Sequence, residues 1–169
     1  MDETKNRTYL VVAVTLLPAQ LDPTRRQMNT LLMPRQRRLH FTKEGDPRRR
    51  KITSAMCKTD ARAVIYDASA ITNQAMARAA CLEALLNEAA DTHAHMLVIE
   101  QDDSLVDSDR RFIYQRVRKL GIEDQFRYEH RRSYEEALLW IPDAVAWCWA
   151  KKGEWRPRVE SMIEHVHVL

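Results

Sequence analysis

The sequence has few of the residues that mark several large classes of protein. It contains only three glycines, six prolines and three cysteines in 169 residues. So little glycine and proline excludes a collagen-like or linker-dominated chain, and a hydrophobic content of 45% excludes a wholly disordered one. The cysteines stand far apart and form no Cys-x-x-Cys pair, which argues against a disulfide scaffold and a cysteine-bound zinc ion.

Long apolar runs and a secretion signal are also missing. The longest apolar run, residues 9–18, is far shorter than the roughly 20 residues that a membrane-spanning helix needs. The chain begins Met1-Asp2-Glu3, which is acidic where a signal peptide is basic. We therefore expect a single cytoplasmic domain over residues 1–169 with no membrane partner, and we leave oligomerisation open.

Several catalytic signatures are absent. The chain has no glycine-rich phosphate loop, no Gly-x-Ser-x-Gly element and no local pairing of cysteine with histidine, so nucleoside-triphosphate hydrolysis and acyl transfer are poorly supported. Two His-x-His pairs, at 93–95 and 165–167, imply no third metal ligand by their spacing.

The hydrophobic pattern predicts strands that alternate with helices, at least in the second half of the chain. Residues 8–17 are apolar on both faces, as in a central strand covered on both sides. Asp22-Pro23 and Asp46-Pro47 are typical helix starts, and Gly121 is typical of a helix end. The pattern indicates one layered domain of the α/β or α+β class, with further strands over 61–67, 95–100, 125–130 and 164–169. Helices are expected over 22–34, 46–57, 72–90 and 142–150, and another follows the acidic loop 101–109 and ends at Gly121.

The net charge of +3 conceals a strong asymmetry. Residues 1–62 carry 14 lysines and arginines against six acidic residues, whereas residues 63–124 carry six against 11. A basic region beside an acidic one fits an anionic partner together with bound cations.

The basic region is densest over residues 35–51. Arg48, Arg49 and Arg50 fall in the first turn of a predicted helix, where positive charge opposes the helix dipole by roughly 0.3–1 kcal/mol each. A bound phosphate would reverse that sign, so we predict phosphate binding by these arginines and by Arg38. The alternative is a solvated charged face. His40 and its neighbour Phe41 have two equally good interpretations, stacking on bases or pairing in a half-buried strand.

Carboxylates follow or begin the most apolar elements. Glu100 ends an apolar strand, and Asp143 stands in the least polar stretch of the chain. Taken singly, each is explained by a solvent-facing strand end or an ordinary helix start. Together they suggest a site, because strand ends in open α/β sheets point into one crevice. The loop after Glu100 adds four acids and lacks the EF-hand spacing of glycine and glutamate: Asp102, Asp103, Asp107 and Asp109.

The order of these short motifs resembles the bacterial "domain of unknown function 3800" proteins. They open with a strand ending in Asp-Glu-Ser, carry a His-Phe-x-x-Glu-like segment, and close on a helix with Ala-Asp-x-x-Ala. The matching motifs here are Asp2-Glu3-Thr4, the strand over residues 9–17, Leu39-His40-Phe41-Thr42-Lys43-Glu44, Val98-Ile99-Glu100 and Ile141-Pro142-Asp143-Ala144-Val145-Ala146.

This resemblance implies a ribonuclease H-like α/β fold, a mixed sheet with helices on both faces. Only Met1 precedes Asp2, so the first strand is expected to be shortened or missing. The resemblance further implies a nuclease that hydrolyses nucleic acid with Mg²⁺ or Mn²⁺, metal ions that prefer oxygen ligands. The implied catalytic and metal-binding residues are Asp2, Glu44, Glu100 and Asp143, with Asp102 or Asp103 as substitutes for Glu100.

Two other functions remain open from the sequence. One is a non-catalytic nucleic-acid-binding or regulatory module that keeps the fold and the basic surface. The other is a protein partner in a defence or toxin-neutralising pair. The enzyme predicts that Asp143→Asn abolishes turnover and preserves binding, whereas the binding module predicts salt-sensitive binding that survives the change.

Overall fold

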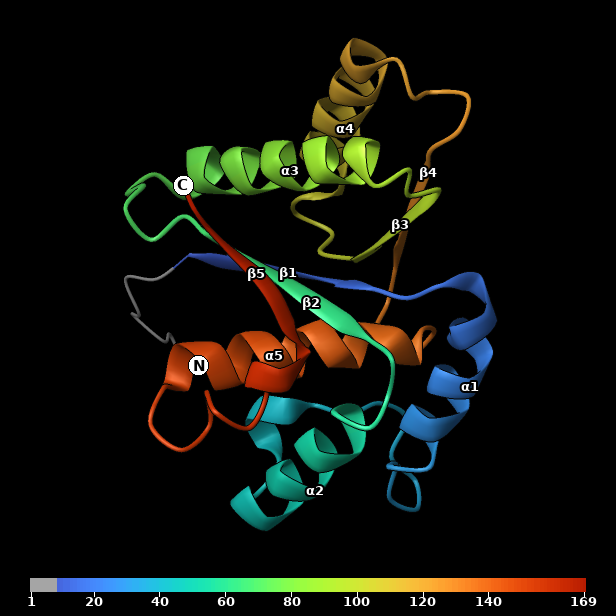
Figure 1. The fold of residues 1–169 in the computed structure, drawn as a ribbon, viewed down its shortest axis with the longest axis vertical. Helices are drawn as coiled ribbons and strands as arrows, with labels where there is room; N and C mark the ends of the chain where they lie inside the picture. The colour runs from blue at the N-terminus through green and yellow to red at the C-terminus, as the bar shows by residue number, and fades with distance from the viewer. Residues whose placement is uncertain (1–8) are drawn as a thin grey trace.

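The computed structural model describes residues 9–169, and Figure 1 shows how they are arranged. These residues form five α-helices and five β-strands, which confirms the α/β class. Asp2 lies outside the described residues. Within residues 9–169, none of the helices has both the length and the apolar character that a membrane crossing requires.

The strands form two small sheets. In the first sheet, β1 (Leu10–Thr15) runs antiparallel to β2 (Arg62–Asp67), and β5 (Ile163–Val168) runs parallel to β2 on its other side. In the second sheet, β3 (Met96–Glu100) and β4 (Arg127–Arg131) are parallel. The prediction of a central first strand is wrong, because β1 is an edge strand and β2 occupies the centre. Side chains from both faces of β1 nevertheless reach apolar cores, which explains its two-faced apolar pattern.

Helices cover both faces of the three-stranded sheet (Figure 1). The first core packs α1 (Pro18–Asn29), α2 (Asp46–Met56) and α5 (Trp140–Lys151) against one face, with Met28, Ile52 and Ile141 fully buried. The second core packs α3 (Gln74–Asp91) and α4 (Val106–Leu120) against the other face. β2 contributes alternate residues to the two cores, as a pleated strand must.

The helix boundaries test the predicted caps. α2 begins at Asp46 and α4 ends before Gly121, whose φ of 68° is the left-handed conformation that glycine favours. α1, however, begins at Pro18 and contains Pro23, so the predicted start at Asp22-Pro23 is wrong. Gln20 caps the N-terminus of α1. Its side-chain oxygen accepts a hydrogen bond from the Leu17 N–H, and its own N–H donates to the Leu17 carbonyl. α5 begins at Trp140, which places Asp143 in its first turn.

Candidate functional site

Two hollows meet at Glu100, the last residue of β3. The narrow hollow, of about 80 Å³, lies between residues 38–40, Glu100, Ser133 and the start of α5 with Leu139, Trp140 and Asp143. The open hollow, of about 550 Å³, is bordered by Arg78, Glu100 and the loop residues 101–105 except Ser104. Glu100 therefore belongs to both.

Local structure brings Glu100 and Asp143 to the same place. Glu100 stands where β3 ends, and Asp143 stands in the first turn of α5. The indole N–H of Trp140 donates to the Ser133 carbonyl at 2.6 Å, which fixes the start of α5 against the segment that follows β4. Among residues 9–169, no cationic side chain forms an ion pair with either Glu100 or Asp143. Of the acids predicted to share one crevice, Glu100 and Asp143 line the narrow hollow, whereas Asp102 and Asp103 border the open one.

The charge of Glu100 acts on the ionisation of Asp143. Surrounding protein desolvates the carboxylate of Asp143, and the negative charge of Glu100 opposes its ionisation, so its pKa is raised. His40, the Phe41 backbone N–H and Arg38 act in the opposite direction with smaller effects. Asp143 is exposed to solvent through the hollow, yet protein atoms surround it on its other sides. The narrow hollow therefore favours added positive charge.

Arg38 and His40 complete the polar lining of the narrow hollow. The Nη1 atom of Arg38 donates to the Ser133 hydroxyl at 2.6 Å, which holds the guanidinium at the edge of the hollow. His40 is half-buried. Of the four arginines predicted to bind phosphate, Arg38 is the one that borders this hollow.

Glu44 has a different environment from the one expected of a shared metal ligand. It is buried, and the Gln36 amide donates to its Oε1 at 2.7 Å while Arg48 Nε donates to its Oε2 at 3.1 Å. Both carboxylate oxygens thus have partners within the protein. The structure does not bring Glu44 into the lining of the narrow hollow.

The arginines of the first turn of α2 bind three separate sets of partners instead of converging on one point. Arg48 also donates to the Leu31 carbonyl. Arg49 donates to the carbonyls of Phe41 and Thr42 and lies over the Trp147 ring, and Arg50 pairs with Glu154 at 2.9 Å. These contacts offset the unfavourable helix dipole that suggested a phosphate, so the structure assigns these charges an intramolecular role.

The acidic loop after Glu100 is held mainly by its own contacts. Asp103 accepts from the Gln101 amide at 2.6 Å and pairs with Arg132 at 3.1 Å, and both interactions lower its pKa. Asp102 accepts from the Ser104 hydroxyl, which lowers its pKa. Among residues 9–169, no three His, Cys, Asp or Glu side chains are placed together to hold a metal ion.

An ion-pair network that no sequence motif indicates lies beside the open hollow. Arg78 donates two hydrogen bonds to Asp109, from Nε to Oδ1 at 2.7 Å and from Nη2 to Oδ2 at 2.6 Å. The Nε2 atom of His130 lies 3.4 Å from the same Oδ2. Arg78 and Asp109 are 31 residues apart, and a single arginine in an alanine-rich helix gives no sequence signal of such a role.

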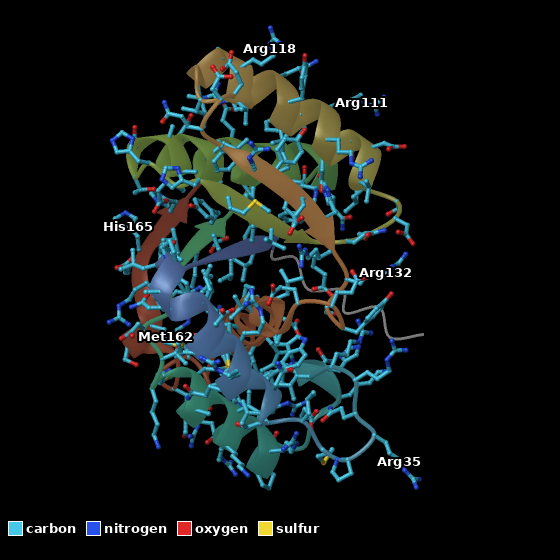
Figure 2. The ribbon with its side chains drawn as sticks, turned by 90° about the vertical axis from the view of Figure 1, so that its right-hand side faces the viewer. Arg35, Arg111, Arg118, Arg132, Met162 and His165 are labelled. Carbon is cyan, nitrogen blue, oxygen red and sulfur yellow. The ribbon has the colours of Figure 1, made fainter. Side chains whose placement is uncertain are left out.

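Two exposed arginines lie on one side of the molecule. Figure 2 shows Arg111 of α4 and Arg132, which follows β4, projecting outward on the same side of the molecule. Comparisons of the chain with protein-family models, with curated proteins and with solved structures give no match.

Proposed function

We propose that the narrow hollow binds Mg²⁺ or Mn²⁺ through Glu100 and Asp143, and that the protein hydrolyses phosphodiester bonds of nucleic acid on a ribonuclease H-like fold. One observation carries the proposal. Two carboxylates that are distant in the sequence line one hollow, and no ion pair with another described residue neutralises them.

The donor set fits such a cation. Mg²⁺ commonly binds proteins through one or two carboxylates and keeps several waters, so two carboxylates are enough without a third protein ligand. A hollow of about 80 Å³ has room for roughly two or three waters at about 30 Å³ each. The raised pKa of Asp143 supports the same conclusion, because a cation would stabilise the ionised form.

The residues of the hollow have separate roles in this reaction. Bound there, the cation supplies stabilisation for negative charge that develops on a phosphoryl oxygen. Glu100 and Asp143 hold and orient it. Arg38, fixed by Ser133, binds a phosphate oxygen of the substrate, and His40 accepts or releases a proton at its imidazole. The family resemblance adds Asp2, outside the described residues, to the ligands.

The surroundings of the hollow favour nucleic acid as the substrate. Tyr134 follows Ser133 directly and is 45% exposed. The Arg37 guanidinium lies 4.9 Å from the centre of that ring. An exposed aromatic ring beside cationic side chains is typical of surfaces on which unpaired bases stack while the backbone phosphates are bound.

The test is cleavage of single- and double-stranded DNA and RNA by the purified protein with Mn²⁺. We expect Glu100→Gln and Asp143→Asn to lower the cleavage rate by about 100-fold or more, since each removes a charged group at the reacting centre. Asp2→Asn should do the same, whereas Asp124→Asn, an exposed loop carboxylate, should leave the rate unchanged. Intact substrates with this chain and with an N-terminally extended one would overturn the proposal.

A non-catalytic nucleic-acid-binding module is the second candidate. It is favoured by the lack of a three-ligand group among residues 9–169. In that case binding falls steeply with salt, is independent of divalent cations and survives Asp143→Asn.

A further inference from the structure

Arg78 borders the open hollow from α3 while a second set of contacts holds it in place. Its side chain is 21% exposed, whereas that of Asp109, its partner, is 3% exposed. Two short hydrogen bonds fix the Nε–Nη2 edge of the guanidinium, and His130 packs against the same carboxylate from β4. The orientation of the guanidinium plane is therefore set by α4 and β4 before any ligand arrives.

The two hydrogen bonds to Asp109 use Nε and Nη2 of Arg78 and leave Nη1 available. Nη1 makes one long contact, to the Tyr9 hydroxyl at 3.4 Å, although it carries two N–H donors. The donors of an arginine match the spacing of phosphate oxygens, and a guanidinium that is already oriented loses less entropy when it binds one.

The charges around the open hollow limit what can bind there. Glu100, Asp102 and Asp103 border it with Arg78. Asp109 pairs with Arg78 and Arg132 pairs with Asp103, so Glu100 and Asp102 leave an excess of negative charge that a free anion would meet. A phosphodiester accompanied by a divalent cation reduces that excess, with the cation beside Glu100 and the phosphate beside Arg78. A volume of about 550 Å³ lies within the range of roughly 300–1,000 Å³ that is usual for small-ligand sites.

We propose that Arg78 binds a backbone phosphate of the substrate strand in the open hollow, next to the cation held at Glu100. Asp109 and His130 are positioning residues that orient the guanidinium. This inference rests on the proposed function and deepens it, because it leads the strand from the narrow hollow toward the N-terminal end of α3.

Binding without turnover tests the inference directly. The probe is a short fluorescein-labelled single strand, as DNA and as RNA, titrated in Ca²⁺ or in EDTA and followed by anisotropy at several salt concentrations. The main variant is Arg78→Met with Asp109→Leu, because removing both members avoids a buried unpaired carboxylate. Arg78→Lys keeps the charge and loses the planar fork. Arg111→Met, which removes an outward-facing arginine from α4 (Figure 2), is the matched control.

We expect the double variant to weaken Ca²⁺-dependent binding by about tenfold, and to lower the slope of log affinity against log salt by about one. Arg78→Lys should weaken binding several-fold, and Arg111→Met should weaken it less than either. Mn²⁺ affinity, followed by electron paramagnetic resonance, should be unchanged in all three, since none removes a proposed metal ligand. Thermal unfolding checks the fold, and Arg78→Lys decides the question if the double variant does not fold.

The outcomes separate the two proposals. If the folded Arg78 variants bind the strand as tightly as the wild type in Ca²⁺, Arg78 is a structural ion-pair residue and this inference is overturned while the nuclease proposal stands. If the wild type binds neither Mn²⁺ nor, in Ca²⁺, the strand, the proposed function fails and this inference fails with it.

Discussion

Carboxylates in the interior of the molecule have arginine partners, whereas two carboxylates at the boundary between the sheets have none among residues 9–169. In the interior, Glu136 and Asp109 each receive two hydrogen bonds from one arginine, Arg25 for Glu136 and Arg78 for Asp109. At the boundary, Glu100 and Asp143 line one hollow, and neither forms an ion pair with a residue from 9–169.

The difference follows burial, because Glu136 and Asp109 are buried whereas Glu100 and Asp143 are exposed. A buried charge without a partner costs several kcal/mol, so the fold pairs the acids that it buries. Glu44, whose side chain is 7% exposed, follows the same rule with Arg48. Glu100 and Asp143 are exposed, so water solvates charges that no arginine pairs. Two like charges in one hollow oppose each other, and such arrangements are common at binding and catalytic sites.

The largest effect should come from removing one partner of a buried pair. Arg48→Met leaves Glu44 without its cation and also removes a donor from the Leu31 carbonyl. We expect the free energy of unfolding to fall by about 3 kcal/mol in denaturant titrations. Arg50→Met, two residues along the same helix, breaks an exposed pair with Glu154 and should cost far less, because solvent screens that pair. Equal losses in the two variants would contradict this comparison.

A smaller effect is expected from neutralising Glu136 without changing its size. The Arg25 hydrogen bonds lower the pKa of Glu136 although burial opposes them, so its ionised form stabilises the fold above its unfolded pKa. That stability is lost as the pH falls through the lowered pKa. Glu136→Gln should cost about 2 kcal/mol at neutral pH. Chemical unfolding below pH 5 should show the cost shrinking, and a cost independent of pH would refute the assignment.

The smallest effect should have the opposite sign. The pKa of Asp143 is raised, so ionisation of this group at neutral pH destabilises the metal-free fold. Asp143→Asn should therefore raise the free energy of unfolding by up to about 1 kcal/mol, because solvent screens part of the repulsion from Glu100. The gain should shrink as the pH falls below the raised pKa and vanish below the ordinary aspartate pKa, where the carboxyl is neutral in the folded and unfolded chains alike. A loss of stability at pH 7 would show that Asp143 has a stabilising partner; Asp124→Asn serves as the control.

The sequence predicts the elements that have a clear hydrophobic period or a local cap. β2, β5 and the Gly121 helix end follow from such signals. The start of α1 does not, because Asp22-Pro23 has good cap chemistry, whereas the true start depends on Leu17 and Gln20. The edge position of β1 could not be read from apolar faces alone, since helices cover both faces of central and edge strands alike.

The site was predictable to the extent that it depends on element ends. The position of Glu100 at a strand end and of Asp143 at a helix start predicts that they lie together, and both line the narrow hollow. The motif resemblance points to Glu44, although Arg48 four residues later offers a local pairing partner. The pairs Arg25–Glu136 and Arg78–Asp109 join residues that are 111 and 31 positions apart, so no local spacing predicts them. Charge patterning cannot tell which distant arginine folds back onto which carboxylate.

The position of β2 has a consequence for the slowest motions of the chain. Residues 63–66 are buried, the strand bonds to β1 on one side and β5 on the other, and its two faces contact different cores. No partial opening that frees one core exposes its amides fully. Its amide protons should therefore exchange with solvent deuterium only when the whole domain unfolds. The exchange rate of these amides then reports the free energy of global unfolding.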